Sequence, residues 1–176
     1  MISMDEVYKT QSMLVYRYLL RMTGDEDLAE ELTQETFYQA VKSIERYDES
    51  CKISTWLCAI AKNQLGKYLR KHPKTGTIDL GDAGEEAIYQ SYVDGGATAD
   101  VQPSAEDEYL QREERVSLMK AMRKLPDTAR EVMYLRIFGN LSFAEIGEVM
   151  EKSENWARVT YYRGKVKLKE EVGTDE

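Results

Sequence analysis

The chain has 176 residues, 42% of them hydrophobic, and a formal net charge of −8 at pH 7, enough for one ordinary domain or two small ones. The longest apolar run, Leu57 to Ala61, is too short to span a bilayer, and no charged segment followed by an apolar one opens the chain, so we expect a cytoplasmic protein without membrane insertion. Two cysteines, Cys51 and Cys58, and one histidine cannot complete a structural zinc site, so we expect free thiols, no metal and no cofactor.

The first two predicted helices occupy the N-terminal quarter of the chain. Residues 4–22 have the apolar spacing of a helix, and Ser3 and Glu6 are placed to form a capping box. The acids at residues 25–27 suit the first turn of a second helix, where the helix dipole favours negative charge, and the apolar pattern continues to about Arg46.

A third helix is predicted after a short polar loop. The pattern starts beyond Ser54, a candidate N-cap, and stops before Pro73, because a residue that precedes proline disfavours helical geometry. We therefore predict that residues 1–74 form a first domain of three helices.

The middle of the chain has a different composition. Residues 75–108 hold nine acids and no base, and residues 75–102 show no sustained periodicity. A connection of this length is unusual inside a compact domain, so we interpret residues 75–102 as an acidic tether between domains. On composition alone, a solvated linker with no further role and a segment that becomes ordered on binding are both open.

The second half of the chain contains another series of helical patterns, assigned here to a domain over residues 103–176. A helix reaches Leu125, and Pro126 occupies the first position of the next helix, which extends to residue 138 before Gly139 closes it. We predict a helical second domain, so that the fold class is all-α with two small helical domains.

The last two helices of this domain have the signature of a helix-turn-helix. Ser142 and Glu145 predict a capping box for a short helix, and Ser153 is placed to cap the final helix after a brief turn. A short capped helix, a tight turn and a long basic helix are the parts of a helix-turn-helix.

The final helix has two distinct faces. The apolar or small residues Ala157, Tyr161, Gly164 and Leu168 share one stripe and predict its core face. The opposite side carries Asn155, Val159, Tyr162, Arg163, Val166 and Lys169, with Trp156 and Arg158 at its edges. Asparagine can hydrogen-bond adenine, apolar groups can touch the thymine methyl, and arginine or lysine can bind phosphate or guanine.

This basic face favours DNA, although another reading is open. Residues 152–169 hold six bases and one acid, enough for about five phosphate contacts. The logarithm of the DNA-binding constant should then fall with the logarithm of the salt concentration with a slope of about −4 to −5. Val159 and Tyr162 could instead pack against the first helices or a partner protein. The caps and the turn favour DNA binding.

The motifs, taken in order, resemble those of the extracytoplasmic-function group of sigma-70-type RNA polymerase sigma factors. GDEDLAEELTQETF resembles the polymerase-binding helix of that family, and STWLCAIAKN resembles its promoter-melting segment. LPDTAREVMYLRIFGNLSFAEIGEVM and SENWARVTYYRGK resemble its −35-reading domain. The resemblance covers nearly the whole chain outside the linker, and it implies sigma domain 2 over residues 1–74 and sigma domain 4 over residues 103–176.

The resemblance also implies three sets of site residues. Contacts to core RNA polymerase would come from Asp27, Glu31, Gln34, Glu35 and Tyr38. Contacts to the −10 element would come from Asp48, Lys52, Ile53, Trp56, Lys62, Asn63, Lys67 and Arg70, with residues 48–53 holding a flipped-out base. Contacts to the −35 element would come from Ser153, Asn155, Trp156, Arg158, Val159, Tyr162, Arg163 and Lys165.

Composition alone supports plainer readings of some of these residues. The acids of the second helix could be only a solvated face, and Trp56 could be only a packing residue. Core RNA polymerase, promoter DNA and an anti-sigma factor are the implied partners, and no small-molecule substrate is expected. The competing function is a stand-alone helix-turn-helix regulator. An enzyme is not expected. The sequence has no phosphate-binding loop, no nucleophile paired with a general base and no set of metal ligands.

The chain departs from the family pattern at four positions. The family usually has Phe near Ile53, Asp at Lys67, Gly at Glu151 and Ala at Gly164. Lys67 reverses a charge beside the −10 site and so affects promoter preference. Glu151 replaces the usual turn glycine, at a cost of up to about 1 kcal/mol if its backbone is left-handed.

Overall fold

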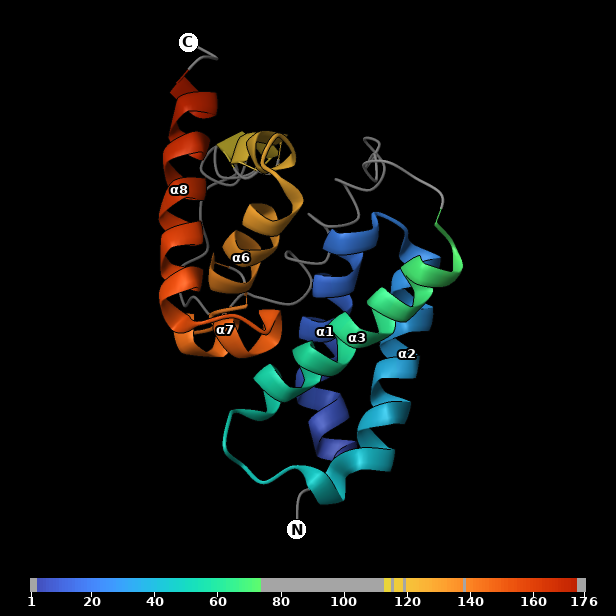
Figure 1. Cartoon of the computed structure of the whole chain (residues 1–176). Helices are drawn as coiled ribbons and strands as arrows, with labels where there is room; N and C mark the ends of the chain where they lie inside the picture. The colour runs from blue at the N-terminus through green and yellow to red at the C-terminus, as the bar shows by residue number, and fades with distance from the viewer. Residues whose placement is uncertain (1–2, 74–112, 115, 119, 138, 174–176) are drawn as a thin grey trace, which may run out of the picture.

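A computed structural model describes residues 3–73, 113–114, 116–118, 120–137 and 139–173, and every regular element within these ranges is a helix (Figure 1). The all-α prediction is confirmed. The proposed tether, residues 75–102, lies outside the described residues. The elements are α1 (Met4–Thr23), α2 (Glu26–Ser43), the 3-10 turn η1 (Ile44–Arg46), α3 (Ile53–Lys71), α6 (Asp127–Ile137), α7 (Phe143–Met150) and α8 (Glu154–Gly173), with further helical turns within residues 113–123.

Helices α1, α2 and α3 form one packed group. Each turns an apolar side inward, and Val15, Leu19, Phe37, Leu57 and Ala61 are buried among them. Burying these side chains is the main source of stability for such a bundle, because short isolated helices are marginal in water.

The turn between α1 and α2 follows the sequence closely. Gly24 adopts a left-handed conformation with φ 65°, and its N–H donates to the Leu20 carbonyl over 2.8 Å. Asp25 then caps α2, accepting from the Leu28 N–H over 3.0 Å. These caps hold α1 and α2 in an antiparallel pair.

Two predicted caps were wrong. Ser3 stands at the N-cap of α1, but its side chain makes no capping hydrogen bond, so the box with Glu6 does not form. Helix α3 begins at Ile53 with Lys52 as N-cap, since the Trp56 N–H already donates to the Lys52 carbonyl. Ser54 therefore lies inside the first turn, where its side chain is not needed as a cap.

Helices α6, α7 and α8 form a second packed group around Val132, Leu135, Ile146 and Ala157, all buried. Pro126 directly precedes α6 and accepts from the Arg130 N–H, so it is the cap residue rather than the first helical residue. The predicted last residue of this helix, Phe138, lies outside the described residues.

The helix-turn-helix is formed by α7 and α8. The capping box at Ser142 is confirmed: its hydroxyl accepts from the Glu145 N–H over 3.1 Å, and the Glu145 carboxylate accepts from the Ser142 N–H over 2.6 Å. Ser153 caps α8 as predicted, accepting from the Trp156 N–H over 3.0 Å. Both helices therefore start at fixed residues.

The turn between α7 and α8 depends on close backbone approach. A Cβ on Gly147 would lie 2.8 Å from the Lys152 carbonyl oxygen, so only glycine fits there without a shift. Glu151 is left-handed, with φ 54° and ψ 43°. The expected strain at this position is therefore present, because a side chain in this conformation crowds its own backbone.

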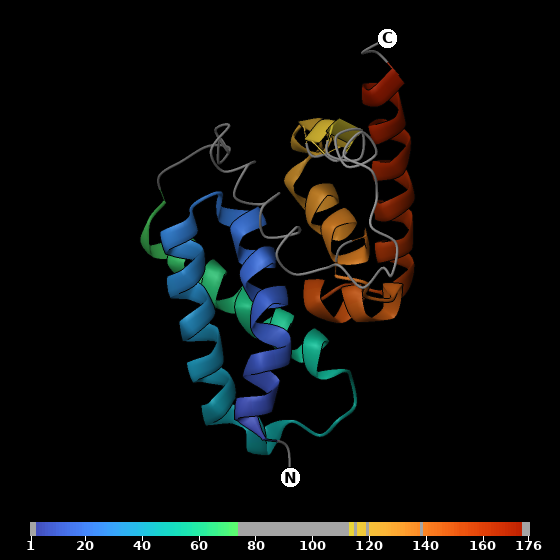
Figure 2. The same ribbon diagram turned by 180° about the vertical axis from the view of Figure 1, so that it is seen from behind.

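The two groups pack against each other, which the sequence did not predict. Figures 1 and 2 show α6 beside α1 and α7 beside the N-terminal half of α3. Tyr18 on α1 and Tyr134 on α6 are both buried, with ring centroids 6.4 Å apart. The side of the first group that faces the second therefore contains α1 and α3.

Replacing Glu151 with glycine should stabilise the protein. Glycine removes the left-handed penalty, but it also gives the unfolded chain more freedom, so we expect a gain of up to about 1 kcal/mol. Urea denaturation followed by circular dichroism measures this difference. Glu151→Ala is the matched control, since it removes the side chain but keeps a Cβ, and an equal gain in that variant would mean that backbone strain is not the cause.

Candidate nucleic-acid interface

The outward face of α8 has the composition expected for a nucleic-acid contact. Val159, Tyr162 and Val166 are 38%, 52% and 57% exposed, whereas Ala157, Gly164 and Leu168 are buried on the opposite side. Val159 and Tyr162 therefore do not pack into the first helix group. Of the eight predicted −35 residues, Trp156 is half-buried. The other seven are exposed, namely Ser153, Asn155, Arg158, Val159, Tyr162, Arg163 and Lys165.

An aromatic cluster fixes the orientation of α8 on α7. The Phe143 ring lies 5.4 Å from the Tyr161 ring and 6.2 Å from the Tyr162 ring, measured between centroids. The Arg136 guanidinium lies 4.6 Å from the Phe143 centroid, and the Arg158 guanidinium 5.5 Å. Cation–π contacts of this kind hold an arginine in place. The Arg158 guanidinium also donates to the Glu154 carboxylate over 2.8 Å.

Phe143 and Arg136 were missed by the sequence analysis. Phe143 counted only as an apolar residue of the short helix, and Arg136 belongs to a helix with no evident DNA face. Arg136 also donates to the Leu141 carbonyl over 2.9 Å, so it ties α6 to the start of α7. Only the three-dimensional structure shows that Phe143 contacts both Arg136 and Arg158.

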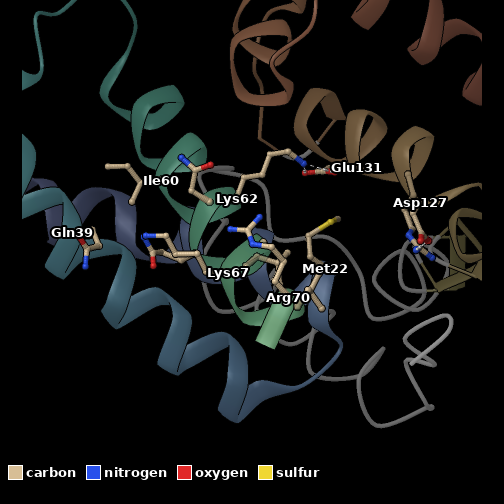
Figure 3. A pocket seen from close by; sticks show the side chains of 14 residues that line it. Met22, Gln39, Ile60, Lys62, Lys67, Arg70, Asp127 and Glu131 are labelled. Carbon is tan, nitrogen blue, oxygen red and sulfur yellow. Dashed lines mark hydrogen bonds and ion pairs between the residues drawn. The ribbon is translucent and has the colours of Figure 1, made fainter. Parts of the chain in front are cut away.

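Four of the eight predicted −10 residues, all on α3, lie along one recess. Lys62, Asn63, Lys67 and Arg70 line a cavity of about 610 Å³ that α6 closes on its far side (Figure 3). Asn63, Lys67 and Arg70 are exposed, while Lys62 is half-buried. The structure therefore brings these four polar side chains together, with the three bases forming a basic wall.

The loop before α3 is organised around Tyr47. Its hydroxyl donates to the Cys51 carbonyl over 2.5 Å, and its ring lies 5.1 Å from the half-buried Trp56 ring. The Asp48 carboxylate accepts from the Ser50 N–H over 3.0 Å, and hydrogen bonds from Ser50 lower the pKa of Asp48. Trp56 thus packs against the loop, and the predicted residues Asp48, Lys52 and Ile53 lie in or next to it.

The predicted polymerase-contact residues share the outer side of α2. Asp27, Glu31, Gln34 and Tyr38 are exposed and follow one another at helical spacing. Glu35 is half-buried and accepts from the Gln39 side-chain amide over 2.7 Å. Tyr38 is 55% exposed, with the Lys42 ammonium 4.6 Å from its ring centroid, so this side presents acidic, amide and aromatic groups together.

Acidic residues of the second group reach the basic residues of the first. Glu131 on α6 accepts from the Tyr18 hydroxyl over 2.5 Å and from the Lys62 ammonium over 3.0 Å. Glu145 on α7 pairs with Lys52 over 3.3 Å. Burial, followed by the Glu131 charge, raises the pKa of Tyr18 well above its ordinary value. Burial alone would raise the pKa of Glu145, but hydrogen bonds from Ser142 and Lys52 lower it overall.

No cluster of His, Cys, Asp and Glu among the described residues is arranged to hold a metal ion. None of the helices in the same parts of the chain is both long and apolar enough to cross a membrane.

Comparison with known proteins assigns both groups of helices. Residues 7–75 match the family model for sigma-70 region 2, and residues 115–168 match that for sigma-70 region 4. The chain is 35% identical to the extracytoplasmic-function (ECF) RNA polymerase sigma factor SigM of Bacillus subtilis over 95% of its own length and 93% of that protein. The chain belongs to the ECF sigma factors of RNA polymerase.

Further comparisons agree with this assignment. SigW of Bacillus subtilis, also an ECF RNA polymerase sigma factor, is 31% identical over 95% of this chain and 86% of its own length. The crystallised sigma factor RpoE of Bartonella quintana, in complex with the anti-sigma factor NepR, superposes with a TM-score of 0.66 over 98% of both chains at 17% identity, which shows the same fold. This sigma factor is therefore a transcription initiation factor and not an enzyme.

Both thiols should react slowly in the folded sigma factor. Burial, with the nearby Glu148 carboxylate, raises the pKa of Cys51, and burial raises the pKa of Cys58 to about 12. The thiolate is the reactive form, so raised pKa values mean little reaction at neutral pH and faster reaction as the pH rises. Reaction with a disulfide reagent, followed by absorbance at increasing pH, checks this, and the chain in denaturant is the control. Rapid labelling of Cys51 at pH 7 would show that its environment differs from the one described.

Proposed function

We propose that three surfaces of this sigma factor divide the work of promoter recognition. The outer side of α2 binds core RNA polymerase, α3 with the loop before it binds the −10 element, and α8 binds the −35 element. The exposed face of α8, with an amide, three large apolar groups and several bases in a capped helix-turn-helix, is the observation that supports the proposal most.

The α8 face matches the chemistry of the major groove. Asn155 lies in the first turn, where residues of a recognition helix meet base edges. Val159 and Tyr162 can contact thymine methyl groups, while Arg163 and Lys165 can bind the backbone phosphates. The Phe143 cluster, by fixing Arg158 and Tyr162, reduces the freedom lost on binding.

The α3 face matches single-stranded DNA. Lys62, Lys67 and Arg70 can neutralise phosphates, and Asn63 can hydrogen-bond a base edge. The loop from Tyr47 to Lys52 is assigned to an unstacked base, and it borders a second recess whose far side is formed by α7. Binding an unstacked base there offsets part of the cost of opening the duplex, without nucleotide hydrolysis.

The outer side of α2 is assigned to core polymerase. It is the one predicted surface in the described residues with clustered acids and an exposed tyrosine, a composition that suits a positively charged protein partner. Residues 1–74 are accordingly assigned as sigma domain 2, residues 103–176 as sigma domain 4, and residues 75–102 as the acidic linker between them. Because core polymerase and promoter DNA are the partners, we assign the protein to the cytoplasm.

An anti-sigma factor is proposed as a further partner. The RpoE structure with the same fold contains the anti-sigma factor NepR. An inhibitor that covers the acidic side of α2 and the basic side of α8 would block both polymerase and −35 binding.

Polymerase binding should depend on Gln34 and Glu35. We expect wild-type protein to bind core RNA polymerase with a dissociation constant well below about 1 μM in fluorescence anisotropy at physiological salt. Changing both residues to arginine should weaken this binding at least about tenfold, since it cancels the negative charge of the docking side. Glu114→Arg, an exposed charge reversal in the other helix group, is the control. Unchanged affinity of the double variant would exclude α2 as the docking helix.

Promoter-binding measurements on two variants should distinguish base contacts from phosphate contacts on α8. With holoenzyme on a promoter mapped by run-off transcription, Asn155→Ala should cost about 1–3 kcal/mol at the cognate −35 element and little on unrelated DNA. Arg163→Ala should weaken binding to both and reduce the salt slope by about 1. Filter binding at several salt concentrations measures these quantities. A uniform loss from Asn155→Ala would place that residue outside the base-reading set.

A further inference from the structure

The first turn of α8 carries an acid that the predicted −35 set leaves out. Glu154 is the first residue of the helix, next to the Ser153 cap, and its side chain is 54% exposed. A carboxylate in this place gains from the helix dipole, which is sufficient reason for it in an ordinary helix. In a helix proposed to lie in the major groove, however, the phosphates of DNA repel the same carboxylate. A role for Glu154 must therefore offset this repulsion.

Glu154 pairs with Arg158, one helical turn further along α8. The Arg158 guanidinium donates to a Glu154 carboxylate oxygen over 2.8 Å, and the same guanidinium lies 5.5 Å from the Phe143 ring centroid. An exposed ion pair of this kind contributes little to the stability of a helix. Its effect is on orientation instead, because two contacts, one from α7 and one from α8, restrict a long side chain that otherwise has many rotamers.

The ion pair uses only part of the hydrogen-bonding capacity of Arg158. A guanidinium has five N–H donors, and one of its terminal nitrogens donates to Glu154. Arginine recognises guanine by donating two parallel hydrogen bonds to the O6 and N7 atoms of the base, which requires two donors on one edge. The Arg158 side chain is 46% exposed, so an edge of the guanidinium is accessible for such a contact.

The charge of Glu154 also affects which acceptor Arg158 prefers. A phosphate is an anion that the carboxylate repels, whereas the O6 and N7 atoms of guanine belong to an uncharged base. An arginine that is already paired with a carboxylate therefore gains less from a phosphate than an unpaired arginine does. Arg163 on the same helix is the comparison, since it is exposed and forms no ion pair with any residue that the structure describes. Arg163 thus suits a phosphate, and Arg158 suits a base.

We infer that Glu154 is a specificity-determining residue of the −35 surface. Through its ion pair, Glu154 positions Arg158 to donate to a guanine and lowers the attraction of Arg158 for the backbone phosphates. The inference rests on the proposed role of α8 in −35 binding. Without the Glu154 charge, Arg158 turns to the nearest phosphate, so discrimination between bases falls while sequence-independent binding increases.

Selection from a promoter library measures this effect. Holoenzyme is bound to promoter fragments that are randomised across the −35 element, and the bound fraction is sequenced. The wild type should prefer guanine at one position at which Arg158→Ala shows no preference. Glu154→Gln should reduce the guanine preference at that position at least about fivefold and leave the preferences at other positions unchanged. In the Arg158→Ala background, Glu154→Gln should have no further effect on base preference, because it acts through Arg158.

The salt dependence of binding is a second readout, which a merely structural role of Glu154 would not change. If Arg158 moves to a phosphate in Glu154→Gln, the slope of the logarithm of the binding constant against the logarithm of the salt concentration should become more negative by about 1. Glu151→Gln is the matched control. It removes the same charge from an exposed residue three positions earlier, which forms no ion pair within the described ranges. Neither the guanine preference nor the salt slope should change in this control.

Failure of the inference and failure of the proposed function give different results. Equal changes in Glu154→Gln and Glu151→Gln would mean that only net charge matters, and an effect of Glu154→Gln that persists in the Arg158→Ala background would mean that Glu154 does not act through Arg158. Either result overturns the inference. The inference also fails, with the proposed function standing, if Asn155→Ala changes a −35 preference but Glu154→Gln changes none. If no variant of α8 changes any −35 preference, the assignment of α8 fails as well. Circular dichroism confirms that each variant is folded before it is compared.

Discussion

The requirement that every helix bury one side fixes which residues remain for polymerase and DNA. In α8, burial of Ala157, Gly164 and Leu168 against the rest of the second helix group forces Asn155, Val159 and Tyr162 outward. The same constraint in α2 turns Phe37 inward and Tyr38 outward. Binding surfaces on such small domains are the remaining faces of helices whose other faces form the core.

Local features of the fold were predictable because they depend on neighbouring residues. Ser142 and Ser153 each cap a helix where the sequence predicts it, since a cap needs only a few adjacent positions. Asp25, predicted in the first turn of the second helix, is its N-cap. The errors at the caps were also local. Two of the four serines that were assigned capping roles are not caps. Ser3 makes no side-chain capping hydrogen bond, and the helix at Ser54 already begins with the Lys52 carbonyl, which accepts from the Trp56 N–H.

The composition of the candidate surfaces was predictable, but their surroundings were not. Helical spacing alone places Asn155, Val159 and Tyr162 on one side of α8. In contrast, the contacts of Phe143 with Arg136 and Arg158, and of Glu131 with Tyr18 and Lys62, join residues from different helices. No periodicity within one helix encodes such pairs. Glu131 in particular reads as an ordinary polar residue of α6 until its buried position is known.

The departures from the family pattern become interpretable through these long-range contacts. The family usually has alanine where this chain has Gly164, and a Cβ there would lie 3.1 Å from Met133 Cγ and 3.2 Å from its sulfur. Glycine at 164 thus matches a methionine at 133, whose flexible side chain fills the space that a methyl group would take. Lys67 extends the basic wall formed by Lys62 and Arg70.

A charge reversal at Lys67 therefore has a consequence beyond promoter preference. Bases along one recess repel one another unless anions lie nearby. On α6, Asp127 pairs with Arg130 at this recess, while Glu131 pairs with Lys62. A phosphate carries the same kind of charge as the Glu131 carboxylate. Lys67 therefore increases the attraction of this recess for any anion, carboxylate or phosphate, and its effect is not limited to one partner.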